Sequence, residues 1–402
     1  MSPTPTPAVA TQNSLRSRNL ALAATHVFAS HEPVARVDVA KATGMTRSTA
    51  SRLIDDLVSA GILQESEPIM SNRRGRPAVP LSPGAGKFFS LGLEVNVSHL
   101  AVRLVDLTGN VIAQLDVDGD YVNSSPKHVL SMLAELSAEA LEEMPEKAEL
   151  TGVQVAVPGL VDVRRNVLLH APNLDWHDVE LFPLLLTNAP ARMQNATHGI
   201  MNEADCAAVL AAREAPGRHS EHTSFLYLSG EVGIGAALVR AGMPVHGPRG
   251  WAGEIGHTCI DPDGPQCRCG ATGCLEQYAG SQALLRRAGA ADMPELIHRL
   301  EANEPTATAA LDEAGAALGL ALANAANLLD VTTIILGGDL GQFGEHYIPH
   351  IMTALDRRLL MRPYVDPKVI ATKPDHAAPA LGAAYIALER IIANPAGWMP
   401  EK

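Results

Sequence analysis

The sequence predicts an α/β protein with a small helical domain at its N-terminus, and two observations support this class. From about residue 88 onward, short runs rich in Val, Ile and Leu alternate with stretches of helical periodicity, which predicts mixed sheets with helices between the strands. The first 82 residues instead show helical periodicity followed by a hairpin pattern. With 402 residues, the chain has room for two or three domains and a sizeable core.

The charge separates the same two parts of the chain. Residues 1–82 hold nine Lys/Arg and six Asp/Glu, a charge of +3, whereas the whole chain carries −13, which leaves −16 on residues 83–402. Only the N-terminal part is therefore expected to approach phosphate. No apolar run reaches the roughly 18 residues of a membrane span, and the N-terminus lacks the apolar core of a signal peptide. We expect a cytoplasmic chain with no membrane partner.

Residues 14–82 have the pattern of a winged helix-turn-helix, preceded by a Pro/Thr/Ala-rich tail at residues 1–13 that we expect to be disordered. Helices are expected at residues 14–30, 34–44 and 47–58, with Gly44 ending the second and Thr46 capping the third. The exposed face at the start of the third helix suits a DNA major groove. It carries Arg47, Ser48, Thr49 and Arg52.

A strand at residues 61–65 leads to a basic hairpin tip around Gly75. The tip carries Arg73, Arg74 and Arg76, which are placed to reach phosphate or a narrow minor groove. The alternative is an ordinary helical hairpin with a solvated basic loop.

The acidic part begins with three consecutive strands and a helix. Strands are expected at residues 88–95, 99–106, 111–115, 152–157, 224–228, 236–240 and 332–336, with a helix at 126–143. Glycines cluster where several of these strands end. They permit close backbone approach to a ligand, although turn chemistry is the better explanation of any single cluster.

The most specific local pattern is His257-x9-Cys267-x-Cys269-x4-Cys274. Three thiolates and one imidazole make a closed tetrahedral set typical of structural zinc. Four of the five cysteines fall within 16 residues, which favours a local metal site over a disulfide framework. Cys259 is left over as a free thiol. The alternative is a set of reduced thiols in a loop.

These motifs, AGEIGH (252–257) and CRCGATGCLE (267–276), resemble those of the ROK family (repressor, open reading frame, kinase). Further stretches match family landmarks in order. They are VAVPGLVD (155–162), HAPNLDW (170–176), NEADCAA (202–208), GEVGIGAALVRAG (230–242), LGGDLG (336–341) and LGAA (381–384). The resemblance implies a two-lobed ribonuclease-H/actin-like fold with a sugar cleft between the lobes. Lobe 1 would span 83–201 with a C-terminal helix at 376–395 returning to it, and lobe 2 would span 202–375 with the zinc loop.

The resemblance also points to candidate site residues. The sugar-binding positions carried over are Asn173, Asn202, Glu203, Glu254, His257 and Glu276. His257 would serve both zinc and sugar, one ring nitrogen for each. Taken singly, Glu254 and Glu276 also fit ordinary surface charge, and Asn173 fits a turn cap.

Two catalytic elements of the family's sugar kinases are altered. Their Asp-x-Gly-Gly-Thr phosphate loop corresponds to Glu94-Val95-Asn96-Val97-Ser98, without either glycine. The aspartate that acts as general base is replaced by Glu203, one methylene longer. We therefore expect no catalytic residue and no enzyme activity.

The resulting hypothesis is a sugar-responsive DNA-binding transcriptional regulator, a repressor of carbohydrate metabolism genes. Its expected partners are an inverted-repeat operator, a sugar or sugar-phosphate effector, and further copies of itself in a homodimer or homotetramer. One alternative is an ATP-dependent sugar kinase with an attached DNA-binding domain. Another is a regulator controlled by a protein partner.

Overall fold

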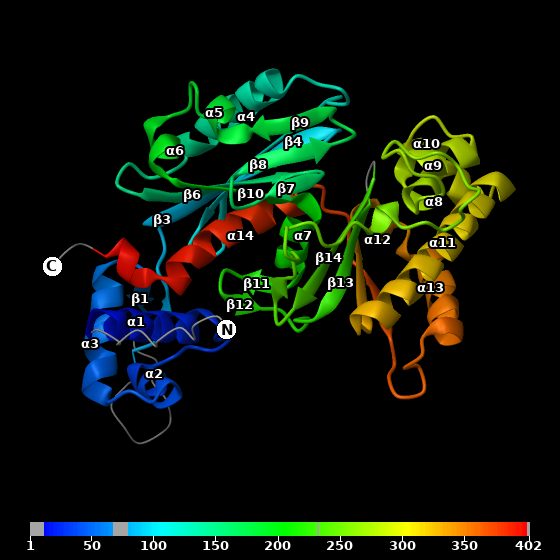
Figure 1. Ribbon diagram of the computed structural model, residues 1–402. Helices are drawn as coiled ribbons and strands as arrows, with labels where there is room; N and C mark the ends of the chain where they lie inside the picture. Colours follow the sequence, from blue (N-terminus) through cyan, green and yellow to red (C-terminus); the bar gives the residue numbers. More distant parts are fainter. Residues whose placement is uncertain (1–11, 67–78, 231–232, 400–402) are drawn as a thin grey trace, which may run out of the picture.

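The computed structural model describes residues 12–66, 79–230 and 233–399 (Figure 1). A small N-terminal domain lies against a larger part made of two α/β lobes. The N-terminal domain contains α1 (Gln12–Phe28), α2 (Arg36–Thr43), α3 (Arg47–Ser59) and an antiparallel pair of strands, β1 (Leu63–Glu65) and β2 (Leu81–Pro83).

Local sequence explains the limits of α2 and α3. Gly44 adopts φ +70°, a left-handed conformation that ends α2. The side chain of Thr46 accepts a hydrogen bond from the backbone N–H of Thr49 at 3.2 Å, which caps α3. α1 begins at Gln12, so the last two residues of the expected tail are helical. Residues 1–11 lie outside the described part of the chain.

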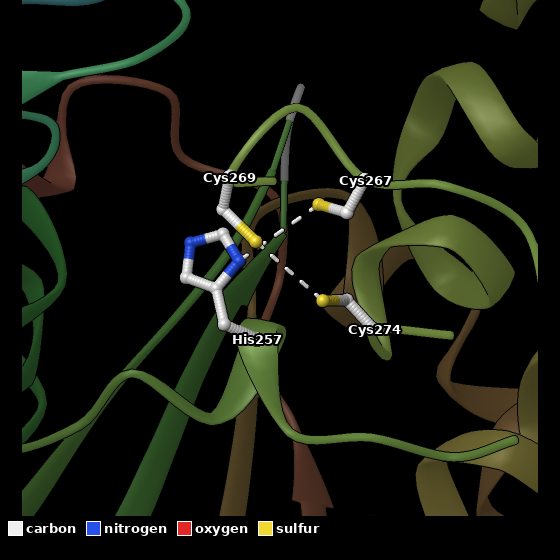
Figure 2. Close-up of side chains that lie close together, drawn as sticks. All are labelled: His257, Cys267, Cys269 and Cys274. Atoms are coloured by element: carbon white, nitrogen blue, oxygen red, sulfur yellow. Dashed lines mark hydrogen bonds between the residues drawn. The ribbon is translucent and has the colours of Figure 1, made fainter. Parts of the chain in front are cut away.

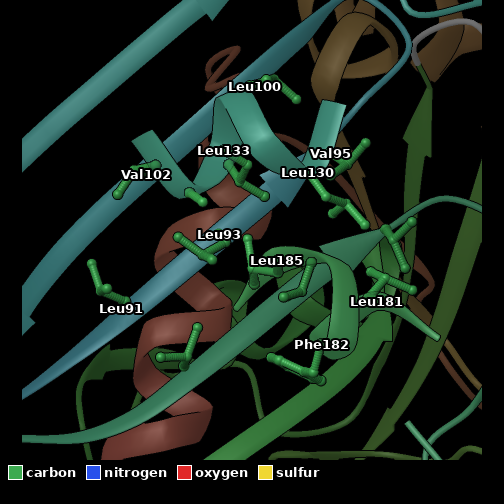
Figure 3. Packing of buried hydrophobic residues seen from close by; sticks show 14 of the residues in the cluster. Leu91, Leu93, Val95, Leu100, Val102, Leu130, Leu133, Leu181, Phe182 and Leu185 are labelled. Carbon is green, nitrogen blue, oxygen red and sulfur yellow. The ribbon is translucent and has the colours of Figure 1, made fainter. Parts of the chain in front are cut away.

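The first lobe is built on a five-stranded sheet in the order β10-β6-β3-β4-β5. Its strands are β3 (Phe88–Val95), β4 (His99–Asp106), β5 (Val111–Asp118), β6 (Glu149–Val157) and β10 (Thr197–Asn202). The helices α4 (Pro126–Glu142), α5 (Leu181–Leu185) and α6 (Ala191–Asn195) accompany it, together with a small sheet of β7 (Leu160–Asp162), β8 (Val167–Ala171) and β9 (Trp176–Glu180). Leucines and valines of β3, β4, α4 and α5 interlock in its core (Figure 3).

The second lobe repeats the topology of the first. Its five-stranded sheet has the order β15-β14-β13-β16-β17. Here β13 pairs antiparallel with β14 and parallel with β16, just as β3 pairs antiparallel with β4 and parallel with β6. The strands are β13 (Phe225–Gly230), β14 (Ile234–Arg240), β15 (Met243–Pro244), β16 (Thr333–Gly337) and β17 (Lys368–Ala371).

Helices cover the outer side of the second lobe. They are α8 (Glu276–Ala279), α9 (Ser281–Ala288), α10 (Met293–Glu301), α11 (Pro305–Leu329), α12 (Gly338–Gln342) and α13 (Gly344–Arg358), with a 3₁₀ turn, η1, at Ile255–His257. No helix within the described ranges is long and apolar enough to cross a bilayer.

Two helices lie between the lobes (Figure 1). α14 (Ala378–Ala393) packs on β3 and β6 of the first sheet, and η2 (Pro395–Trp398) follows it. α7 (Glu203–Ala211) packs on β13 and β14 of the second sheet and leads into the hairpin of β11 (Arg213–Ala215) and β12 (Arg218–His219). α7 and α14 pack directly against each other, so this helix pair is where the two lobes meet.

Candidate functional site

A cavity opens between the lobes, and it brings together residues from both of them. The first lobe contributes the ends of β3 and β6 and the turn after β8, and the second contributes β14, η1 and the loop before α8. All six side chains that the sequence nominated for sugar binding line this one cavity: Asn173, Asn202, Glu203, Glu254, His257 and Glu276.

Asn202 and Glu203 stand where β10 gives way to α7. The Asn202 carboxamide oxygen accepts from Ala204 N at 2.8 Å as the N-cap, and its amide nitrogen donates to Gly159 O at 3.0 Å. Both ends of this carboxamide are thus engaged by the backbone, which fixes how α7 begins. Glu203 Oε2 accepts from the amide of Asn96, 3.5 Å away on the end of β3. Asn96 was not singled out by the sequence, because its role depends on a contact across the fold.

Glu254 and Glu276 approach the cavity from neighbouring segments of the second lobe. Glu254 immediately precedes η1. The preceding residue, Gly253, allows this segment to pack closely on β14, because a Cβ at Gly253, where φ is +110°, would lie 2.0 Å from Ala236 O. Burial raises the pKa of both carboxyls against the opposing charge of His257, and for Glu254 the charges of Asp205 and Glu276 also raise it. The cavity therefore holds partly desolvated carboxyl groups, which suit paired hydrogen bonds to hydroxyls.

Beside the cavity, four potential metal ligands converge (Figure 2). The ligand atoms of His257, Cys267, Cys269 and Cys274 all lie within 4.8 Å of one another. Cys269 Sγ is 3.7 Å from Cys274 Sγ, and Cys267 Sγ is 4.0 Å from His257 Nδ1. This is the cluster that the sequence spacing predicts.

The cluster fits a tetrahedral metal ion. Metal–ligand bonds of about 2.0–2.3 Å give a tetrahedron with edges of roughly 3.5–3.8 Å, close to the separations between these atoms. Burial, followed by hydrogen bonds from the neighbouring thiols, raises the pKa of Cys274 to about 12. A divalent cation would supply the positive charge that three adjacent thiolates require.

One further side chain, Arg268, reaches the cavity from the same loop. It stands between the potential metal ligands Cys267 and Cys269, and its Nη1 donates to Oδ1 of Asn173 at 3.4 Å. Asn173 belongs to the turn between β8 and β9, so this hydrogen bond connects the two lobes beside the cavity. The sequence offered one signal for Arg268, its position between two ligands, but its partner lies 95 residues away.

The residues nominated for DNA contact lie partly within the described chain. Arg47, Ser48 and Arg52 are exposed at the start of α3, whereas Thr49 is half-buried. The Thr49 hydroxyl is also engaged with Thr46 Oγ1 at 2.9 Å, within the helix cap. Arg73, Arg74 and Arg76 lie outside the described residues.

The segment from Glu94 to Ser98, which the sequence aligns with the phosphate loop of the family's kinases, makes contacts with its neighbour His99 and with α14. Glu94 is fully buried, and its Oε2 accepts from Ala380 N at the start of α14 at 3.3 Å. Its Oε1 lies 3.4 Å from Nε2 of His99. The branched side chain of Val97 is buried at the cavity wall.

Comparisons with known proteins match both parts of the chain. The model of the ROK family matches residues 90–390, and the model of the IclR helix-turn-helix domain matches residues 26–67. The xylose repressor of Bacillus spizizenii is 27% identical over 368 residues, which cover 90% of this chain and 93% of the repressor. The glucokinase of Thermotoga maritima is 26% identical over 75% of this chain and 98% of its own length.

Among solved structures, one similar protein is a ROK family transcriptional regulator described as a homolog of the Escherichia coli Mlc protein. It superimposes with a TM-score of 0.79 at 22% identity, over 96% of this chain and 98% of its own. At this identity, the likeness establishes the fold, including the placement of an N-terminal domain beside two lobes. The glucokinase match, in contrast, leaves a quarter of this chain without a counterpart.

Proposed function

The chain belongs to the ROK family, and we propose that it is a transcriptional regulator of carbohydrate metabolism genes whose affinity for DNA is set by a sugar in the cavity. One observation carries this proposal: the same chain joins a helix-turn-helix domain to a cavity lined by carboxylates and amides. Relatives that span almost the whole chain include the xylose repressor, which supports the role of a repressor.

The contacts of Glu94 and Val97 support a regulator rather than a kinase. A kinase needs this carboxylate free to help hold the nucleotide's magnesium, and it needs backbone open to phosphate. Here Glu94 accepts from the first turn of α14, and Val97 places a branched side chain at the cavity wall. Glu203 can still accept a sugar hydroxyl as a hydrogen-bond partner, which requires no proton transfer.

The charges around the cavity favour a neutral sugar over a sugar phosphate. Three carboxyl groups, those of Glu203, Glu254 and Glu276, surround a single guanidinium, that of Arg268. A phosphate group would meet this net negative field and lose hydration without adequate compensation. Since similar proteins are named xylose repressors, D-xylose is the first sugar to test.

We propose that the His257–Cys267–Cys269–Cys274 cluster holds a structural zinc ion, which would fix the loop that carries Arg268 and the orientation of His257. DNA contact is assigned to Arg47, Ser48, Thr49 and Arg52, with Arg73, Arg74 and Arg76 on the wing. We further propose a cytoplasmic homodimer or homotetramer that binds an inverted-repeat operator, with half-sites spaced by whole turns of DNA.

The test joins three measurements on the full chain. A thermal-shift panel of D-xylose, D-glucose, N-acetyl-D-glucosamine and D-glucose 6-phosphate identifies the ligand, since a sugar at 100 times its Kd stabilises by about 2.7 kcal/mol. DNA duplexes selected from a random pool then report affinity with and without that sugar. Sustained ADP release from ATP with any of the sugars would instead identify a kinase.

A further inference from the structure

The N-terminal domain is anchored on the first lobe through a shared hydrophobic core. Leu20 and Phe28 of α1 belong to the same buried cluster as Leu388 and Ile392 of α14. Phe88, at the start of β3, also belongs to this cluster. Burial of this kind stabilises by roughly 25 cal/mol per Å² of apolar surface, so the N-terminal domain should follow the first lobe when it moves.

The second lobe reaches the N-terminal domain at the turn of the β11–β12 hairpin. Gly217 forms this turn with φ +75°, and a Cβ there would lie 2.9 Å from Cβ of Phe28 and 2.7 Å from Cδ1 of Ile392. Glu214, on β11, contacts His31 of the N-terminal domain, with 3.1 Å between Oε2 and Nδ1. The hairpin therefore touches both α1 and the residues that follow it.

This hairpin is continuous with the cavity. α7 begins at Glu203 on the cavity wall and spans nine residues, about 13 Å, before the chain enters β11. Along its length, Ala207 and Ala208 pack with Phe225 and Tyr227 of the second sheet. α7 and the hairpin thus form a continuous connection from the wall of the cavity to the N-terminal domain.

The lobes are in close contact, and Glu389 of α14 also binds the hairpin. α7 and α14 meet through small side chains and backbone: a Cβ at Gly382 would lie 1.9 Å from Cys206 O. Farther along, Gly217 N donates to Glu389 Oε1 at 3.4 Å, and the same carboxylate accepts from Arg213. Closely packed helices shift by small translations, and such shifts are a recurrent form of domain closure.

We propose that the β11–β12 hairpin is the surface through which the second lobe acts on the DNA-binding domain. The inference rests on the proposed function. A sugar that binds residues of both lobes draws the lobes together, and a change at the α7–α14 contact then alters how the hairpin presses on Phe28 and His31. The displaced domain carries α3 with it, and a shift of a few ångströms changes whether two recognition helices of an oligomer fit successive major grooves.

A methyl group at the contact tests this proposal. Gly217→Ala places a Cβ against Ile392 of α14 and Phe28 of α1, whereas Gly86→Ala, at φ +76° in open space, is the matched control with the same left-handed strain and no collision. On a duplex selected by the wild-type chain, Gly217→Ala is expected to change DNA affinity at least about fivefold without any sugar. Gly86→Ala should stay within about twofold of the wild type.

The sugar arm uses D-xylose and D-glucose as probes. Gly217→Ala should bind either sugar as the wild type does but lose most of the sugar-dependent change in DNA affinity. If Gly217→Ala keeps both the wild-type DNA affinity and the full sugar response, the hairpin is not the transmitting surface. If the DNA affinity of the wild type responds to neither sugar, these neutral sugars are not its effectors. The comparison of Gly217→Ala with the wild type in the absence of sugar still tests the role of the hairpin.

Two less disruptive variants provide a second test in case Gly217→Ala does not fold. Glu214→Gln and His31→Gln both alter the contact between these two residues without adding a collision, and Glu214→Gln also removes the ion pair with Arg218 inside the hairpin. Hydrogen exchange of the backbone amides of α1 should rise in both, and their effects on DNA affinity should not be additive. Additive effects, with unchanged exchange in α1, would overturn the proposal.

Discussion

The Nε2 atom of His257 lies 3.9 Å from Oε2 of Glu254, and both residues line the cavity between the lobes. The other ring nitrogen, Nδ1, faces the thiol of Cys267 at 4.0 Å. One imidazole therefore connects the thiol cluster with the cavity wall. Because a metal ion fixes the orientation of a ligand ring, the geometry of this wall should depend on whether the cluster is loaded.

Loss of the metal should accordingly weaken both the fold and the sugar response. We expect Cys267→Ser combined with Cys269→Ser to abolish zinc binding, measured by elemental analysis. If the loss of zinc lowers the free energy of unfolding by about 3 kcal/mol, Tm should fall by roughly 6–12 °C. Cys259→Ser is the control, since this exposed thiol lies outside the cluster. One zinc retained at full occupancy in the double variant would refute the ligand assignment.

The cluster could be predicted from the sequence because its spacing is local. Cys267, Cys269 and Cys274 lie within one loop, and a short loop with glycines can close around an ion whatever the rest of the fold does. The fold class could be predicted for a related reason: the alternation of strands and helices follows from periodicities that neighbouring residues impose.

The contacts across the fold could not be predicted in the same way. Arg268 meets Asn173 only because two lobes face each other, and Gly217 meets Phe28 only because a hairpin of one lobe touches a helix packed on the other. Asn202, nominated for sugar, lines the cavity; each end of its carboxamide makes one hydrogen bond to the backbone, which leaves one N–H and one oxygen lone pair for a ligand. Local patterns identify residue types suited to a site, whereas tertiary packing decides which of their atoms are available.

The hydrogen bond between Arg268 and Asn173 should strengthen sugar binding by holding the lobes together. A hydrogen bond of this kind contributes about 0.5–1.5 kcal/mol, so Arg268→Ala should weaken sugar binding roughly 2- to 12-fold in titration calorimetry. Arg286→Ala, an exposed arginine on α9, is the matched control. An unchanged Kd for Arg268→Ala would show that this contact does not help to close the cavity.

The arginines assigned to DNA should differ in what they contribute. Arg52→Ala, on the exposed face of α3, should relax the preference for the selected duplex over random DNA. Replacement of Arg73, Arg74 and Arg76 by Ala should weaken binding to all sequences and reduce the slope of log K against log salt by about 0.9 for each lost phosphate contact. An unchanged salt slope would mean that the wing does not touch DNA.

The pair of His246 and Asp205 predicts a dependence of stability on pH. His246 Nδ1 lies 3.0 Å from Oδ2 of the buried Asp205, and this hydrogen bond raises the pKa of His246 above its usual value, against the effect of burial. A raised pKa in the folded chain means that protonated His246 stabilises the fold. The contribution is complete below about pH 6.5 and is lost as pH rises through the folded-state pKa.

His246→Gln should therefore reduce the free energy of unfolding by about 1 kcal/mol at pH 6 and by much less at pH 9, measured by urea denaturation. His346→Gln, at an exposed position of α13, controls for the loss of a histidine as such. An equal loss at both pH values would show that the pair acts through packing rather than through charge.

Glu254 offers the most direct test of the link between the cavity and DNA. Its carboxyl group borders the cavity beside His257, in the second lobe. Glu254→Ala should thus leave DNA affinity without sugar unchanged and abolish the sugar response, which we expect to be 5- to 150-fold in the wild type for a coupling of about 1–3 kcal/mol. Glu254→Gln keeps a hydrogen-bonding oxygen and should retain part of the response. Fluorescence anisotropy of a labelled duplex, titrated with each variant at fixed sugar, measures both quantities. If Glu254→Ala still shifts DNA affinity at the sugar concentration that saturates the wild type, the sugar acts from a different site.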